Sequence, residues 1–352
     1  MKKWIKSGLF VVSLATIFMY TQHASACTRI VYKGTDGLVL TARSMDWSSD
    51  LHTNLWILPR GIQRTGEEGS QSIKWTSKYG SVISAVYDMA ATDGMNEKGL
   101  VANLLWLAES QYPEWDGKRP KLSMAGWVQY VLDNFATVNE AVNALKKEPF
   151  ILMTGAMPGE GPKATLHLSI SDPTGDNAIF EYINGKLVIH HDTAYTVMTN
   201  SPIFDQQLAL NEYWKAIGGL TMLPGTNRAA DRFVRASFYS SVLPKTKDAH
   251  TAVAGILSVI RNCSVPLGIS TADQPNIAST LWRTVSDQKN LIYYFESSKT
   301  PNTFWVDFKT VDFSSSASAR RLNLTNNEVY AGNAAAAFVQ SESYKIKGSP
   351  KG

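Results

Sequence analysis

Short apolar runs rich in β-branched and aromatic residues, bounded by turn residues, lie between residues 28 and 105, a composition typical of β-strands. They predict strands over residues 28–32, 38–43, 54–58, 82–87 and 100–105. Asp93-Gly94 and Lys98-Gly99 have the composition of turns. The apolar spacing then becomes helical and predicts a helix over residues 122–135. Thr137 and Glu140 match a capping box that opens a second helix, to about Lys147.

The second half of the chain repeats this order of strands followed by helices. Strands are expected over residues 165–171, 178–182, 187–191 and 195–199, and helices over 204–217, 229–243 and 248–262. Late strands are expected at 284–286, 291–296 and 303–307. Alternating blocks of this kind predict an α+β fold with sheets between helical layers. The polar end of the chain, residues 341–352, is expected to be a flexible tail.

The first 26 residues have the pattern of an export signal. Lys2, Lys3 and Lys6 precede an apolar run over residues 8–20, and Ala24-Ser25-Ala26 supplies the small residues of a cleavage site. The run is shorter than the roughly 20 residues of a membrane helix. We therefore expect residues 1–26 to be removed and residues 27–340 to form a single exported domain, periplasmic or extracellular. An anchor that stays uncleaved is the alternative.

Charge and composition narrow the possible partners. Removal of the three signal lysines lowers the formal net charge from +4 to +1. Nucleic-acid binding normally needs a clustered basic face, so no nucleic-acid partner is expected. The 44% of hydrophobic residues is ample for a large core, and no stable membrane insertion is expected.

Cysteine usage points to the chain start. The sequence has two cysteines, Cys27 and Cys263, which either pair or leave Cys27 free. After cleavage, Cys27 would carry a thiol and an α-amine with reference pKa values near 8.5 and 8. Such a residue can supply both nucleophile and base. If strand 38–43 returns beside strand 28–32, Arg43 and Asp46 come close to it.

A cysteine that follows a signal peptide can instead be a lipid attachment site. Lipoprotein signals usually place leucine three residues before that cysteine, and this chain has Ala24 there. This departure argues against the rival to an enzyme, a membrane-tethered binding protein in which lipidation would consume the thiol.

Five ordered motifs resemble the choloylglycine hydrolase family, the group of bile salt hydrolases and penicillin V acylases. They are Cys27-Thr28-Arg29, residues 43–46 (Arg-Ser-Met-Asp), residues 93–100 (Asp-Gly-Met-Asn-Glu-Lys-Gly-Leu), residues 199–202 (Thr-Asn-Ser-Pro) and Arg232-Phe233. The resemblance implies a four-layer αββα N-terminal-nucleophile fold and hydrolysis of a linear, non-peptide amide in a small molecule. It implies no metal and no organic cofactor.

The resemblance also assigns roles to residues. It makes Cys27 the nucleophile and its amine the proton relay, with Arg43 beside the sulfur. Asp46 would accept a hydrogen bond from the amine, Asn200 would donate its amide to the oxyanion, and Arg232 would complete the polar network. The second oxyanion donor would be the backbone N–H of Trp106.

Trp106 departs from the family, in which bile salt hydrolases carry Asn and penicillin V acylases Tyr at this position. Together with Trp47 it would line an aromatic cleft, which suits an aryl or long acyl group and is similar to Gram-negative acylases, some of which also accept acyl-homoserine lactones. Between Asn200 and Arg232 the chain is about 20 residues shorter than Gram-positive bile salt hydrolases, in a stretch used for tetramer assembly. A homo-oligomer, tetramer or dimer, is expected.

His190-His191 is the one pair that could suggest a metal ligand set. Adjacent strand residues point to opposite faces, and no third ligand stands at useful spacing. Structural histidines are the preferred interpretation, and Cys263 is expected to be a buried packing residue.

Overall fold

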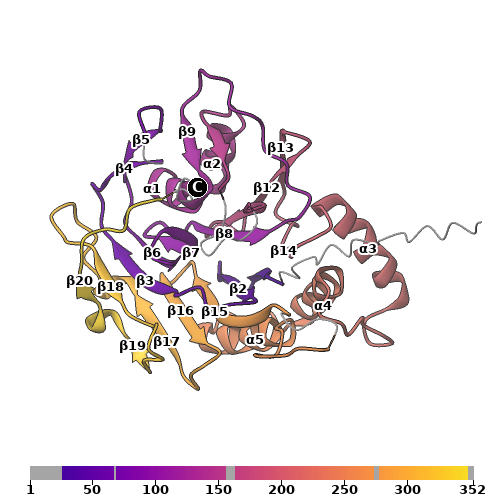
Figure 1. The fold of residues 1–352 in the computed structure, drawn as a ribbon. Helices are drawn as coiled ribbons and strands as arrows, with labels where there is room; N and C mark the ends of the chain where they lie inside the picture. The colour runs from indigo at the N-terminus through magenta and orange to yellow at the C-terminus, as the bar shows by residue number, and fades with distance from the viewer. Residues whose placement is uncertain (1–25, 67–68, 156–162, 273–276, 348–352) are drawn as a thin grey trace, which may run out of the picture.

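Two large β-sheets, stacked face to face, form the centre of the molecule (Figure 1). The structure is a computed structural model that describes residues 26–66, 69–155, 163–272 and 277–347. Within these ranges the first sheet has the strand order β14 (Val197–Met198), β1 (Thr28–Lys33), β2 (Val39–Trp47), β15 (Ser279–Asp287), β16 (Ile292–Ser297), β17 (Thr303–Asp307) and β19 (Gly332–Asn333).

The second sheet is built largely from the middle of the chain. Its described strands run in the order β13 (Lys186–His191), β12 (Asn177–Ile183), β11 (Leu166–Ser171), β8 (Val101–Trp106), β7 (Ala90–Asn96), β6 (Ser81–Val86), β3 (Asn54–Leu58), β18 (Arg320–Leu322) and β20 (Val339–Gln340). Two small pairs flank it, β4 (Gln63–Thr65) with β5 (Lys74–Thr76) and β9 (Lys121–Ser123) with β10 (Ile151–Met153).

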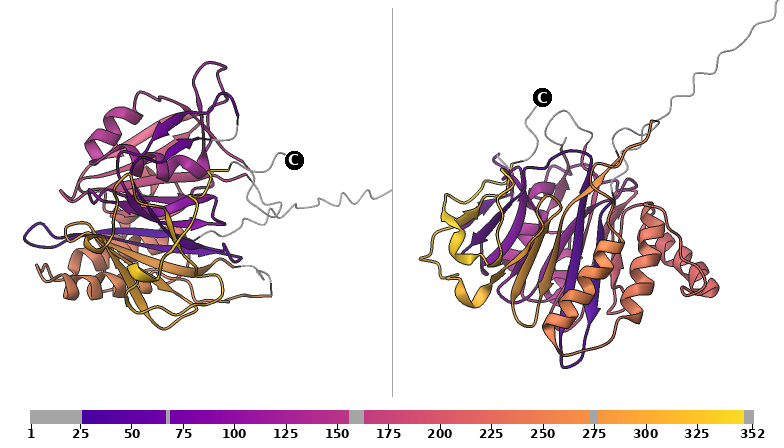
Figure 2. Two further views of the ribbon diagram at one scale, coloured as in Figure 1. Left: turned by 90° about the vertical axis from the view of Figure 1, so that its left-hand side faces the viewer. Right: turned by 90° about the horizontal axis from the view of Figure 1, so that it is seen from below.

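Helices cover the outer face of each sheet, as the side view in Figure 2 shows. Helices α1 (Trp127–Asn134) and α2 (Val138–Leu145) pack on the second sheet, and α4 (Ala229–Val242) and α5 (Ala249–Asn262) pack on the first. Helix α3 (Phe204–Ile217) lies against α4. The predicted four-layer αββα fold is confirmed.

The register of β1 and β2 decides which side chains meet between the sheets. Thr28 lies opposite Ser44 and Arg29 opposite Arg43. Because successive side chains of a strand point to opposite faces, Arg29 and Arg43 point toward the second sheet. Cys27, one residue before β1, shares their side of the sheet. Thr28 points to the helices instead, where Arg232 of α4 donates to its hydroxyl.

Two local predictions were wrong. Asp93-Gly94 is no turn but lies inside β7. A Cβ at Gly94 would stand 2.6 Å from Ile83 Cγ2 and 2.9 Å from Leu132 Cδ1, so glycine is there because α1 approaches the strand closely. The helix expected over 122–135 begins only at Trp127, since residues 121–123 pair with β10 as a strand.

The flexible tail expected over residues 341–352 is also wrong where the structure describes it. Tyr344 and Ile346 are buried against α1 in the core outside the second sheet. The Tyr344 hydroxyl donates to Gln129 Oε1 at 2.9 Å. Scattered apolar residues anchor this segment without a strand or helix pattern, and residues 348–352 lie outside the described ranges.

The predicted export signal falls on residues 1–25, outside the described residues, with Ala26 the first residue described. Among the residues that the structure describes, no helix has the length and hydropathy needed to cross a membrane.

Candidate active site

Cys27 directly precedes the first residue of β1 and lies between the two sheets. Its side chain is buried, and Sγ is 3.9 Å from Arg43 Nη2, from Met45 Sδ and from the Asp46 carbonyl oxygen. Burial raises the pKa of the Cys27 thiol, and the nearby Arg43 cation opposes this increase. Neither cysteine is in a disulfide, so the pairing of Cys27 with Cys263 is excluded and Cys27 is a free thiol.

Arg43 is held beside the sulfur by three different contacts. Its Nη2 donates to the Leu104 carbonyl of the second sheet at 3.0 Å and lies 3.4 Å from Met45 Sδ. The guanidinium carbon stands 4.6 Å from the centre of the Trp282 ring, in cation–π contact. The structure thus places Arg43 next to the sulfur, where the resemblance would put it. Trp282 was missed in the sequence because only the order β1-β2-β15 brings it there.

Arg232 connects three segments of the site from the helix side. Its Nη1 donates to the Cys27 carbonyl at 2.5 Å and to Thr28 Oγ1 at 2.6 Å, and its Nη2 donates to Asn200 Oδ1 at 2.8 Å. The side chain is completely buried. The expected polar network around the cysteine is therefore present, with Arg232 at its centre.

Asn200 contacts both Cys27 and Trp106. Its Oδ1 accepts from the Cys27 backbone nitrogen at 2.7 Å, and its Nδ2 donates to the Trp106 carbonyl at 2.7 Å. An asparagine amide has two hydrogens, so the Trp106 carbonyl uses one of them. The oxyanion role expected for Asn200 would depend on the other.

The backbone of Trp106 is oriented by the pairing of β8 with β11. Leu107 N–H donates to the Thr165 carbonyl across this pair, and Trp106 is the residue before it. Since neighbouring residues of an antiparallel strand alternate in hydrogen bonding, the N–H and C=O of Trp106 point away from β11. This is the side on which Asn200 contacts the Trp106 carbonyl. The N–H expected to be an oxyanion donor thus points to the Asn200 side of β8.

Asp46 does not make the hydrogen bond that was expected of it. In this structure Ala26 still precedes Cys27, and the Cys27 nitrogen is a peptide N–H that donates to Asn200. Asp46 lies on the helix side of β2, where its Oδ2 accepts from Ser44 Oγ at 3.3 Å. Burial raises the pKa of Asp46 to about 6, and the Arg232 cation acts against this increase. Asp46 therefore lies close to Cys27, but the acceptor of the Cys27 nitrogen in this structure is Asn200.

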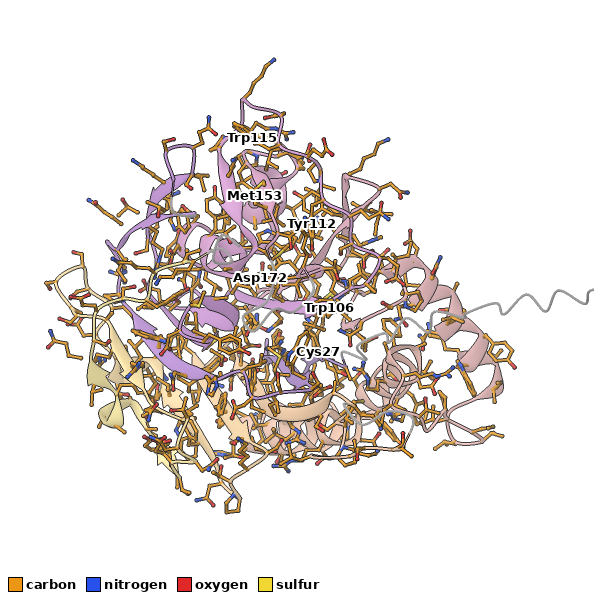
Figure 3. All side chains as sticks on the ribbon, in the orientation of Figure 1. Cys27, Trp106, Tyr112, Trp115, Met153 and Asp172 are labelled. Atoms are coloured by element: carbon orange, nitrogen blue, oxygen red, sulfur yellow. The ribbon has the colours of Figure 1, made fainter. Side chains whose placement is uncertain are left out.

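A cleft opens from Cys27 toward solvent and has mostly apolar walls. Trp47 and Trp106 stand together on one side, with ring centres 5.4 Å apart and planes inclined by 52°. Cys27 and Trp106 are labelled near the centre of the molecule in Figure 3. The other walls come from Met45, Leu51, Val86, Tyr87, Met89, Ala90, Met124, Ala125, Ala164 and Leu166. Both tryptophans of the prediction therefore line this cleft.

The histidine pair behaves as the alternation rule requires. His190 faces Glu181 and Asp205, whereas His191 points to the other face and contacts Asp176. Across the described ranges, no group of three or more histidine, cysteine or acidic side chains has the arrangement of a metal site. Cys263 is fully buried, with its sulfur 3.8 Å from the Arg232 carbonyl, as expected for a packing residue.

Two stacked sheets between helical layers, with a free cysteine directly before the first strand, define the class of N-terminal-nucleophile hydrolases. The family described as linear amide C–N hydrolases, choloylglycine hydrolase family, matches residues 27–326. The chain belongs to this family, and it is a hydrolase of linear amide bonds.

Solved and curated relatives agree with this assignment. The chain is 51% identical to penicillin V acylase of Pectobacterium atrosepticum, over 98% of both chains. It is 57% identical to the structure of penicillin V acylase from Agrobacterium tumefaciens, with a TM-score of 0.86, covering 92% of this chain and 100% of that one. Identity to the bile salt hydrolase/transferase of Clostridium perfringens is 27%, over 77% of this chain and 89% of that protein.

The contact between Arg43 and Cys27 predicts the reactivity of the thiol. Arg43→Leu removes the cation that favours the thiolate, so the pKa of Cys27 should rise and alkylation by iodoacetamide at pH 7 should slow. Arg43→Lys keeps a cation and should lie between Arg43→Leu and wild type. The pH dependence of alkylation, measured by mass spectrometry in a Cys263→Ala background, checks this. An Arg43→Leu profile that coincides with wild type would contradict it.

Proposed function

We propose that this chain is an exported penicillin V acylase-like enzyme that uses Cys27, freed by removal of residues 1–26, as its nucleophile. The observation that carries the proposal is the position of the sulfur. Cys27 lines an apolar, aromatic cleft, and the polar groups of Arg43, Asn200 and Arg232 are gathered around the same residue. Such a site can bind an apolar acyl group and present its carbonyl to a thiol.

In the proposed reaction the Cys27 thiol gives its proton to the residue's own α-amine, and the sulfur attacks the amide carbon. The C–N bond breaks, the electron pair stays on the leaving nitrogen, and that nitrogen takes the proton from the ammonium group. The acyl group remains on sulfur as a thioester. Water then attacks the thioester, releases the carboxylic acid and returns a proton to the sulfur through the amine.

Charged groups and hydrogen-bond donors around Cys27 support the steps of this reaction. Arg43, 3.9 Å from the sulfur, favours the thiolate over the thiol. The second Asn200 amide hydrogen and the Trp106 N–H are the donors proposed for the oxyanion. Cleavage turns the Cys27 nitrogen into an amine, which has more hydrogens to donate than the peptide N–H. Asp46, buried beside Cys27 and close to Arg232, is the acceptor proposed for one of them.

The walls of the cleft favour an aryl acetyl group over a steroid. They are mostly apolar, and the paired indoles of Trp47 and Trp106 can stack on a single aromatic ring. The phenoxyacetyl group of penicillin V presents a single ring to Trp47 and Trp106, and the relatives that are more than half identical bear the name penicillin V acylase.

Two other acyl groups belong to the proposal as alternatives. The long chain of an acyl-homoserine lactone is thin and apolar, and the flexible Met45, Met89 and Met124 side chains can adjust to it. Glycine- or taurine-conjugated bile salts rank behind because their fused rings are not aromatic and cannot stack on the two indoles in the same way. They stay among the candidate substrates because the 27% identical relative is named a bile salt hydrolase/transferase.

The proposal places the mature enzyme in the periplasm or outside the cell, as a homo-oligomer. Export is supported by the signal pattern over residues 1–26. Self-association is supported by exposed apolar side chains on α3 and the segment after it, namely Leu210, Tyr213, Leu220 and Met222. Exposed apolar residues gathered in one region commonly mark contacts between proteins.

Replacement of the proposed nucleophile gives the first test of function. Cys27→Ser keeps the shape of the site but offers a hydroxyl that ionises far less readily than a thiol. We expect kcat on penicillin V to fall by more than about a thousandfold, with unchanged thermal unfolding. Cys263→Ala, the matched control at the other cysteine, should keep kcat within about twofold, as expected of a packing residue. Turnover of Cys27→Ser near the wild-type rate would exclude the mechanism.

A side-by-side assay tests the substrate. Penicillin V, a long-chain acyl-homoserine lactone and glycocholate are incubated with the wild-type enzyme, and the released amine is quantified. The single-ring argument predicts the highest kcat/KM for penicillin V and the lowest for glycocholate. Trp106→Ala should raise KM for penicillin V several-fold, because a ring loses its stacking partner. Faster hydrolysis of glycocholate than of penicillin V would contradict the assignment.

A further inference from the structure

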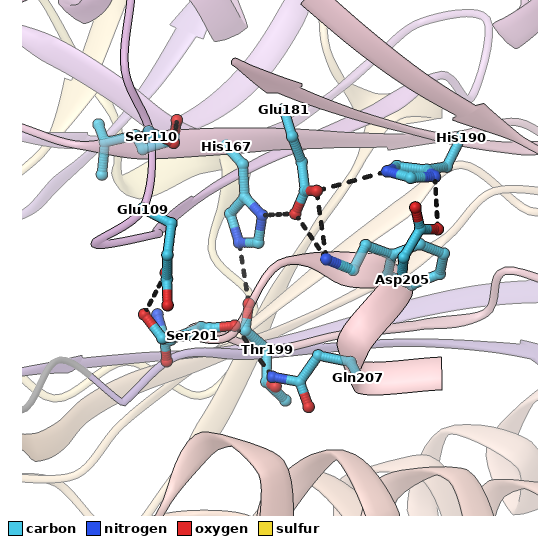
Figure 4. A network of polar contacts seen from close by, with 12 residues as sticks. Glu109, Ser110, His167, Glu181, His190, Thr199, Ser201, Asp205 and Gln207 are labelled. Atoms are coloured by element: carbon cyan, nitrogen blue, oxygen red, sulfur yellow. Dashed lines mark hydrogen bonds and ion pairs between the residues drawn. The ribbon is translucent and has the colours of Figure 1, made fainter. Parts of the chain in front are cut away.

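The segment that carries Asn200 is held by side chains rather than by a sheet. Strand β14 ends at Met198, and α3 begins only at Phe204. Asn200 therefore stands on irregular backbone, where no strand ladder fixes its position. The carbonyl groups of Thr199 and Asn200 are instead contacted by two buried side chains from separate elements, His167 and Gln207 (Figure 4).

His167 of β11 reaches Thr199 from the second sheet. Its Nε2 lies 2.9 Å from the Thr199 carbonyl oxygen, and its Nδ1 lies 3.0 Å from Glu181 Oε1. A carbonyl oxygen can only accept a hydrogen bond, so Nε2 must carry a hydrogen for this contact to form. The side chains of His167 and Glu181 are both almost completely buried. The contact therefore forms without competition from bulk water.

Glu181 joins His167 to a larger network of polar contacts. Glu181 accepts from the Phe204 N–H and contacts His190, whose other nitrogen lies 3.5 Å from Asp205 Oδ1. Burial alone would raise the pKa of Glu181, but hydrogen bonds from His167 and His190 lower it to about 2. Both nitrogens of His167 thus face oxygen atoms, Glu181 Oε1 on one side and the Thr199 carbonyl on the other, which fixes the orientation of the ring.

Gln207 of α3 holds the next residue from the opposite direction. Its Nε2 donates to the Asn200 carbonyl at 3.1 Å, and its side chain is buried. This hydrogen bond ties the first turn of α3 to the backbone of Asn200.

We propose that His167 and Gln207 are positioning residues that fix the Asn200 backbone, and through it the Asn200 side chain, for catalysis. The inference rests on the proposed function, because that function gives Asn200 its role at the oxyanion. Neither residue touches Cys27 or the cleft in this structure. Each acts through a main-chain carbonyl on or next to Asn200.

The expected effect is on kcat rather than on KM. The cleft that binds the acyl group is formed by other residues and stays in place. A donor displaced by about 1 Å at the transition state can cost as much as a hundredfold in rate. We therefore expect His167→Leu, which removes the ring that contacts the Thr199 carbonyl, to lower kcat at least roughly tenfold with KM within about twofold.

A double-mutant cycle separates this role from a general loss of stability. His167→Leu and Gln207→Leu are each combined with Asn200→Ala, and kcat and KM on penicillin V are measured for all variants. If the two residues act through Asn200, each should lower kcat in the wild-type background and change it by less than about twofold once Asn200 is alanine. Gln207→Leu provides an arm that keeps Glu181 and His167 paired, should His167→Leu fold poorly.

His191→Leu is the matched control, since this histidine lies on the other face of β13 and contacts Asp176 at the surface. Its kcat should equal the wild-type value. Equal losses of kcat in both Asn200 backgrounds, or wild-type kcat in both His167→Leu and Gln207→Leu, would overturn the inference while leaving the proposed function intact. A wild-type kcat in Asn200→Ala itself would overturn the oxyanion role of Asn200 in the proposed function, and this inference with it.

Discussion

The guanidinium of Arg232 donates hydrogen bonds to the carbonyl of Cys27, to the hydroxyl of Thr28 and to the side chain of Asn200, and it does so completely out of contact with water. A buried cation is costly unless its donors are satisfied and a counter-charge lies near. Asp46 provides that charge from the neighbouring strand. Burial lowers the pKa of Arg232, and the carboxylate of Asp46 opposes the change. The position of the cysteine thus depends on the buried Arg232 cation, whose charge is balanced in part by the nearby Asp46 carboxylate.

The two faces of the first sheet divide the chemistry of the site. Toward the helices, Arg232 and Asp46 surround the backbone of Cys27. Toward the second sheet, Arg43 stands beside its sulfur, and the cleft opens between aromatic walls. Because side chains alternate between the two faces along β1 and β2, Arg232 and Asp46 lie on one face of the sheet, and Arg43 and the cleft lie on the other. The hydrogen bonds of His167 and Gln207 extend the same division to Asn200, which they hold from outside the cleft.

Much of the fold could be predicted from the sequence, because most strands and helices carry a clear period. Helix α3 and strands β3 and β17 have the predicted limits. The errors arise where tertiary contact overrides local pattern. Gly94 resembles a turn residue, but the close approach of α1 places it in a strand. Tyr344 is anchored by long-range packing and by Gln129, which leaves no periodic signal.

The site was predictable to the extent that its motifs are local. Cys27, Arg43 and Arg232 stand where the resemblance placed them, whereas the partner of the Cys27 nitrogen is Asn200 rather than Asp46 while Ala26 remains attached. His167 and Glu181 gave no signal, since a lone histidine on an apolar strand is usually a core residue. Only the sheet order brings them beside Thr199.

The central claim is that sulfur and primary amine belong to the same terminal residue in the working enzyme. The intact mass and N-terminal sequence of protein purified in active form test it most directly. The account predicts a chain that starts at Cys27 with an unmodified amine. Full activity in protein that retains residues before Cys27, or that carries a lipid or other group on its amine or sulfur, would contradict it.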